Sequence, residues 1–216
     1  MTRIVLSVIA VAMVGCASPF GEPGPVFPVS AQDRAGTDYF PQALREMTLR
    51  CGVFGVGGGQ RKMNGVTDWY GHHLRAAGEA PLFRSAGSSL RFTWLRTFHA
   101  PLVVRLDTAA DGAVTITATE LSGHGGYEPG AIGRRIERRL SAGETAALTR
   151  MVEQTGVLKQ TAATCNIGLD GAGWMVESVG ADGYRFIERQ SPESGPVRTF
   201  GLHLIGLTGW TYDNLY

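Results

Sequence analysis

The sequence LRFTWLRTFHAPLVVRLDTAADGAVTITATEL, residues 90–121, decides the fold class. Three runs within it are rich in β-branched and aromatic residues and alternate between apolar and polar positions, as the strands of a sheet do. The pair Asp111-Gly112 between the second and third runs is typical of a tight hairpin turn. This stretch therefore predicts antiparallel strands that follow one another along the chain.

The C-terminal half continues the strand pattern. One strand is predicted at residues 134–140, and two more at residues 174–179 and 184–190. The last two flank Gly180-Ala-Asp-Gly183, which is another Asp-Gly turn. Residues 168–190 are therefore expected to form a second hairpin together with its entry turn.

Helical patterns are fewer than strand patterns. Ser141 and Glu144 have the spacing of a capping box, which predicts a helix over residues 141–155. The other predicted helices cover residues 40–50 and 66–78 and the segment from Pro196 onward. Together these elements predict an α+β fold, in which an antiparallel sheet of about five or six strands is packed by two or three helices on one face.

The N-terminal sequence MTRIVLSVIAVAMVGCAS resembles the signal of a bacterial lipoprotein. Arg3 precedes an apolar run over residues 4–14 that is too short to span a bilayer but suits a signal peptide. The small residue Gly15 stands directly before Cys16, as in a lipobox. The resemblance implies that residues 1–15 are removed and that Cys16 is acylated. An ordinary cleaved signal peptide and a buried apolar helix are the alternatives.

The residues that follow Cys16 extend this expectation. Ala17 stands where an Asp would resemble an inner-membrane retention signal, so the outer membrane, facing the periplasm, is the expected location. The prolines and glycines of residues 16–38 predict an extended tether without a helix or a central strand. The remaining residues, 39–216, are expected to form a single α+β domain.

Two further cysteines, Cys51 and Cys165, remain in the predicted domain. In an oxidising periplasm such a pair favours a disulfide, which would stabilise the domain by roughly 4 kcal/mol through loop closure. Two buried free thiols are the alternative. Neither cysteine has the sequence setting of a catalytic nucleophile.

Composition and motifs narrow the possible functions. The net charge of +1 gives no reason to expect nucleic acid as a partner. The glycine-rich residues 52–60 lack the endings of a phosphate loop and of a dinucleotide fingerprint. His72 and His73 are adjacent, so they point in different directions on a helix and cannot chelate one metal well. We therefore expect no cofactor and no metal.

Charged and aromatic side chains of the predicted strands suggest a binding surface. In this interpretation aromatic rings form platforms, arginines hold an anion, and two acids of the 168–190 hairpin contribute. The candidate residues are Trp94, Arg96, Arg105, Asp170, Trp174, Glu177, Tyr184 and Arg189. The alternative is a solvated sheet face on which Glu177 pairs with Arg185 or Arg189 across the hairpin.

Several runs in the region after Leu90 resemble a group of bacterial proteins of uncharacterised function. These runs are WLRTFHAPLVVRLD, GLDGAGW, RQSPESGPVR and GLHL. The resemblance implies no activity, substrate or cofactor, and it assigns no role to any residue.

These observations together predict an outer-membrane lipoprotein with a binding or interaction domain. Apart from the membrane, its expected partners are an envelope protein or a small anionic ligand. A periplasmic hydrolase that uses an acidic residue of the 168–190 hairpin is the first alternative. An inhibitor that presents a rigid strand edge or loop to one partner is the second.

Overall fold

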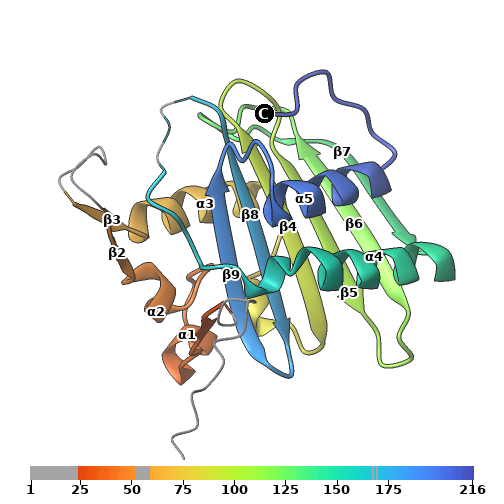
Figure 1. The fold of residues 1–216 in the computed structure, drawn as a ribbon, viewed down its shortest axis with the longest axis horizontal. Coiled ribbons are helices and arrows are strands. Elements are labelled where there is room, and N and C mark those ends of the chain that lie inside the picture. Colours follow the sequence, from red (N-terminus) through yellow and green to blue (C-terminus); the bar gives the residue numbers. More distant parts are fainter. Residues whose placement is uncertain (1–23, 52–58, 167, 169) are drawn as a thin grey trace, which may run out of the picture.

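A seven-stranded antiparallel sheet organises the domain, with the strand order β1-β9-β8-β4-β5-β6-β7 (Figure 1). The computed structural model describes residues 24–51, 59–166, 168 and 170–216. The lipoprotein-like signal, Cys16 and most of the glycine-rich loop 52–60 therefore lie outside the described residues. The α+β class predicted from the sequence is confirmed.

The strands follow the predicted runs closely. Those of the main sheet are β1 (Val26–Phe27), β4 (Ser88–Arg96), β5 (Leu102–Thr108), β6 (Val114–Leu121), β7 (Ile132–Arg139), β8 (Ala172–Gly180) and β9 (Gly183–Gln190). A separate antiparallel pair consists of β2 (Thr48–Arg50) and β3 (Gln60–Lys62). The predicted turns join β5 to β6 and β8 to β9, and Gly112 and Gly183 have the positive φ angles that such turns require.

The seventh strand, β1, comes from the segment that was predicted to be a tether. Val26 and Phe27 pair with Arg185 and Tyr184 of β9, and the short helix α1 (Ala31–Ala35) follows with a capping box at Ser30. The prediction of a tether to residue 38 was therefore wrong from Gly24 onward. A two-residue edge strand is compatible with the prolines on either side of it, because an edge strand needs few ladder hydrogen bonds.

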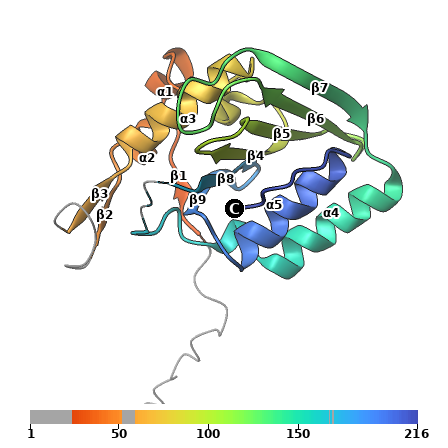
Figure 2. The same ribbon diagram turned by 90° about the horizontal axis from the view of Figure 1, so that it is seen from above.

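Helices cover both faces of the sheet rather than one (Figure 2). On one face lie α4 (Ala142–Thr155) and α5 (Pro196–Leu207), and on the other lie α3 (Asn64–Ala76), α2 (Gln42–Arg45) and the 3-10 turn η1 (Leu82–Arg84). The two faces bury separate apolar clusters. The sheet needs both covers because its central strands are apolar on both sides, as Leu102, Val103 and Val104 show.

The helix predicted at residues 40–50 is much shorter in the structure. Helix α2 ends at Arg45, and the chain then forms β2, where Thr48 pairs with Lys62. The hydrogen bonds of this strand pair replace those of a longer helix. The helices predicted at residues 141–155 and from Pro196 are confirmed as α4 and α5.

The capping box of α4 is tied to the sheet by an ion pair. Glu144 accepts hydrogen bonds from the Ser141 backbone at 2.8 Å and from Arg138 at 2.7 Å. These contacts, the Arg138 hydrogen bond above all, lower the pKa of Glu144 to about 2. The carboxylate therefore stabilises the start of α4 at neutral pH.

We expect Glu144→Gln to lower the melting temperature at pH 7 but not at pH 2. A carboxylate with a lowered pKa stabilises the folded state above its ordinary pKa of 4.5, and this contribution is lost as the pH falls towards 2. Thermal unfolding between pH 2 and pH 7 measures the difference. Glu153→Gln, at an exposed position of the same helix, is the control. A Glu144→Gln effect that is equal at both pH values would contradict the expectation.

Candidate functional site

Part of the predicted binding surface lies in the core beneath the C-terminal segment. Trp94 and Trp174 are fully buried, and both indole N–H groups donate to the main-chain oxygen of Tyr216, at 3.1 and 3.2 Å. The Arg96 guanidinium lies 4.2 Å from the centre of the Trp94 ring, is 4% exposed and donates to the Ala100 carbonyl. The interpretation of these three residues as surface platforms and an anion clamp was therefore wrong.

A second part of the predicted surface is buried on the opposite face, where it forms an ion network. Glu177 accepts from Arg91 Nε at 2.7 Å and Nη2 at 2.9 Å, and from the Tyr184 hydroxyl at 2.8 Å. Glu177 stands opposite Phe186 in the hairpin, so its partner is Arg91 of β4 and not an arginine of β9. The predicted cross-hairpin ion pair is absent.

The network extends to the segment that follows α3. Arg91 donates to the Ala80 carbonyl at 2.7 Å, and Glu79 accepts from Arg91 at 3.4 Å and from Arg105 at 3.1 Å. Burial lowers the pKa of Arg91, but the adjacent carboxylates outweigh it and raise the pKa above the ordinary value. The charged groups of the network bond to one another and to the protein backbone. The network is therefore structural and does not offer a ligand site.

The last two predicted residues hold loops in place. Asp170 is exposed, and its backbone carbonyl accepts from Gln190 Nε2 at 3.4 Å. Arg189 donates to the Thr161 carbonyl at 3.0 Å, and burial lowers the pKa of its guanidinium. The predicted residues thus lie on both faces and at the end of the sheet, and the structure does not bring them together into one surface.

A cavity of about 280 Å³ lies on the α3 side of the sheet. Glycines form much of its wall, and Trp69, Tyr70 and Leu95 contribute apolar surface. Its polar side chains come from distant parts of the chain and are those of Arg61, Tyr70, Thr97, Glu188 and Gln190. Polar and apolar surface contribute about equally to the wall, and a concave site with a few converging polar groups can hold a small molecule.

A buried ion pair forms the polar centre of this cavity. Arg61 Nη1 donates to Glu188 Oε2 at 2.9 Å, and the two side chains are 8% and 2% exposed. Burial raises the pKa of Glu188 above its ordinary value, although the hydrogen bond and charge of Arg61 oppose the shift. A carboxyl group with a raised pKa in a cavity is a general mark of functional sites.

Tyr70 adds a hydroxyl group that has no hydrogen-bond partner among the described residues, although it is fully buried. Burial raises the pKa of Tyr70 well above its ordinary value, Glu188 adds to the shift and Arg61 opposes it. The hydroxyl lies so close to β8 that a Cβ atom at Gly173 would be 2.2 Å from it. A buried hydroxyl without a partner costs about 1–3 kcal/mol, so the Tyr70 hydroxyl is a source of instability in this part of the core.

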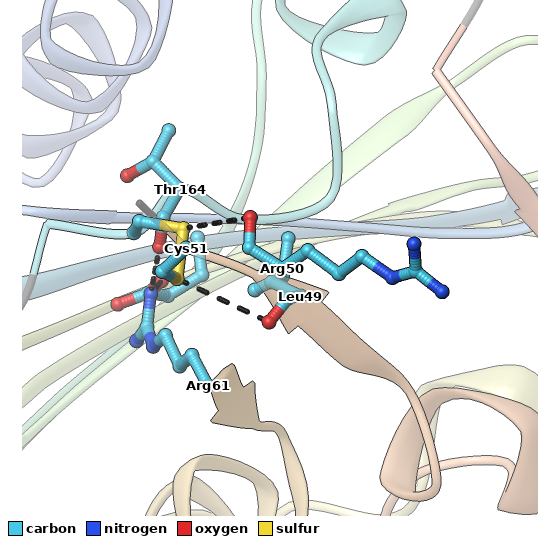
Figure 3. Close-up of a disulfide and its surroundings, with 7 residues drawn as sticks. Leu49, Arg50, Cys51, Arg61 and Thr164 are labelled. Carbon is cyan, nitrogen blue, oxygen red and sulfur yellow. Dashed lines mark hydrogen bonds and ion pairs between the residues drawn. A yellow bond between two sulfur atoms is a disulfide. The ribbon is translucent and has the colours of Figure 1, made fainter. Parts of the chain in front are cut away.

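The predicted disulfide between Cys51 and Cys165 is confirmed, and it lies beside Arg61 of the cavity wall (Figure 3). The Cys51 amide donates to Gly59 at 2.8 Å, which closes the β2–β3 pair beside Arg61. Thr164 precedes Cys165, and its carbonyl accepts from Arg61 Nη1 at 2.5 Å. The bridge thus joins the strand pair to the segment beside β9 and holds Arg61 over Glu188.

Sequence reasoning missed Arg61, Tyr70 and Glu188 as site residues. Alternation in the second hairpin correctly places Glu188 on the same face as Tyr184 and Phe186. Alternation alone does not show what covers either face of a hairpin, so Glu188 gave no reason to expect a cavity. Arg61 and Tyr70 are far from Glu188 in the sequence, and they share no motif with it that would predict their contact.

Comparisons with known proteins do not supply a function. The chain matches no protein-family model and no curated protein.

Within the described ranges, no three His, Cys, Asp or Glu side chains cluster in a way that could hold a metal ion. No helix in the part of the chain that the structure describes is long and apolar enough to cross a membrane.

We expect Tyr70→Phe to keep or slightly raise the free energy of unfolding, because it removes an unpaired buried hydroxyl. Tyr184→Phe is the matched variant, since Tyr184 is equally buried but donates to Glu177. Loss of this hydrogen bond in Tyr184→Phe should lower the free energy of unfolding by about 1.5–3 kcal/mol, the usual range for a hydrogen bond to a charged group. Urea unfolding of both variants measures this. An equal loss in both would show that Tyr70 has a partner within the protein.

Proposed function

We propose that this chain is a lipid-anchored protein of the outer membrane, facing the periplasm, whose domain binds a small neutral polar molecule in the cavity. The observation that carries the binding proposal is the Arg61–Glu188 ion pair, which lies in the wall of the cavity. A ligand that bonds the remaining N–H groups and the free carboxylate oxygen of this pair offsets part of the cost of burying them.

The charge balance of the cavity favours a neutral ligand over the anion expected from the sequence. Arg61 is the cation that lines the cavity, and Glu188 already neutralises it. Arg61 can donate from the N–H groups of Nε and Nη2, and Glu188 Oε1 can accept because Oε2 alone bonds Arg61. Hydroxyl and amide groups, which both donate and accept, match this combination.

One observation of the structure supports a place in the cell envelope. The Cys51–Cys165 disulfide fits an oxidising compartment, in which such bridges form and persist. The lipid anchor itself rests on the sequence around Cys16, which resembles a lipobox.

A hydrolase that uses Glu188 is the second candidate function. The raised pKa of Glu188 in a cavity favours it, because such a carboxyl group can donate a proton to a leaving group. However, Glu188 is the one carboxylate among the described residues that line the cavity, so the second carboxylate of a typical acid–base pair is missing there. We therefore rank binding above hydrolysis.

Binding is tested with the full chain in detergent, by thermal shift in glucose, N-acetylglucosamine and glucuronate. We expect a neutral sugar to raise the melting temperature and anionic glucuronate to do so less. Arg61→Gln should abolish the shift, because it leaves Glu188 without its partner, whereas Glu153→Gln should not change it. A larger shift with glucuronate would contradict the proposed charge preference.

The lipid anchor is tested by the intact mass of membrane-extracted protein. We expect cleavage before Cys16 and the added mass of acyl chains, and Cys16→Ser should give an unprocessed or soluble protein. Cys51→Ser is a control, since it removes the disulfide but not the anchor. A Cys16→Ser protein that is still acylated and membrane-bound would contradict the anchor without affecting the binding proposal.

A further inference from the structure

Exposed aromatic side chains gather at the mouth of the cavity. Trp69, Phe98 and Tyr127 are 40%, 51% and 56% exposed. Trp69 lines the cavity itself, and Phe98 and Tyr127 directly follow the lining residues Thr97 and Gly126. We call Trp69, Phe98 and Tyr127 the aromatic ridge.

Contacts among the loops show that the ridge is continuous with the cavity. The Trp69 indole donates to the Gly125 carbonyl at 3.0 Å, and the Gly126 amide donates to the Thr97 carbonyl at 3.0 Å. The Phe98 and Tyr127 ring centres are 6.2 Å apart. The two loops that carry the ridge are therefore bonded to each other and to α3 beside the cavity.

A peptide strand is a poor candidate for this surface. An extended peptide binds by adding to a free sheet edge. Beside the cavity the outer edge of β9 is occupied, because the Glu188 amide donates to the Ala162 carbonyl at 2.7 Å. The glycine-lined wall and exposed rings instead suit a ligand with flat apolar faces and polar edges.

We propose that the ligand is a glycan chain of N-acetylated hexosamines, with one terminal sugar in the cavity and the next sugars on the aromatic ridge. This inference rests on the proposed function and names its ligand class. An acetamido group carries a carbonyl that accepts from Arg61 and an N–H that donates to Glu188. The apolar faces of sugar rings cover exposed aromatic rings, whose rims remain free for hydroxyl contacts.

The test compares N-acetylglucosamine with its β-1,4-linked trimer by titration calorimetry on the full chain in detergent. We expect the trimer to bind at least about tenfold more tightly than the monomer. The double variant Phe98→Ala/Tyr127→Ala should lose this gain and keep monomer binding, whereas Arg61→Gln should weaken the binding of both ligands. Val26→Ala, at an exposed apolar position on the edge strand β1, is the control.

The outcomes separate the inference from the proposed function. Equal affinity for monomer and trimer, or an unchanged gain in the ridge variant, would overturn the glycan inference and leave small-molecule binding in place. Binding of glucose but of neither N-acetylated sugar would overturn it as well. If no neutral sugar binds, both proposals fail. Melting temperatures of the ridge variants near that of the parent protein show that they are folded.

Discussion

The buried guanidinium of Arg91 constrains the whole α3 side of the sheet. It lies in the central strand β4 and is fully buried, so its charge must be neutralised within the protein. Glu177 on β8 and Glu79 from the segment that follows α3 neutralise this charge, and the Ala80 carbonyl accepts a hydrogen bond from the same guanidinium. The same contacts that neutralise Arg91 therefore fix the register of β4 against β8 and dock α3 on the sheet.

The position of α3 determines the cavity. Once α3 is docked, Tyr70 reaches β8 at Gly173, where any larger residue would meet the hydroxyl. The polar side of the cavity depends on the disulfide. This bridge holds the β2–β3 pair in a position where Arg61 donates a hydrogen bond to Glu188. The ion network positions Tyr70, and the disulfide positions Arg61 beside Glu188. The residues of the cavity wall therefore come from elements that do not pair with one another in the sheet.

Local patterns predicted much of the fold, but long-range pairing could not be predicted in the same way. Asp-Gly turns and a capping box act within a few residues, so the hairpins and α4 were recognised. Arg91 and Glu177 are 86 residues apart, and an alternating charged strand looks the same whether its partner is a neighbouring strand or water. Arg61 and Glu188 are 127 residues apart and share no motif, so the candidate site appeared only in three dimensions.

The account depends on a buried polar centre in which Glu188 is shielded from water. The most direct test is a carbon-13 NMR titration of the Glu188 carboxyl in the oxidised protein, assigned with Glu188→Gln. We expect a midpoint above the ordinary value of 4.5, because burial outweighs the opposing charge of Arg61. A midpoint at or below 4.5 would show that burial does not dominate at this carboxyl group, and would contradict the water-shielded centre on which the binding proposal depends.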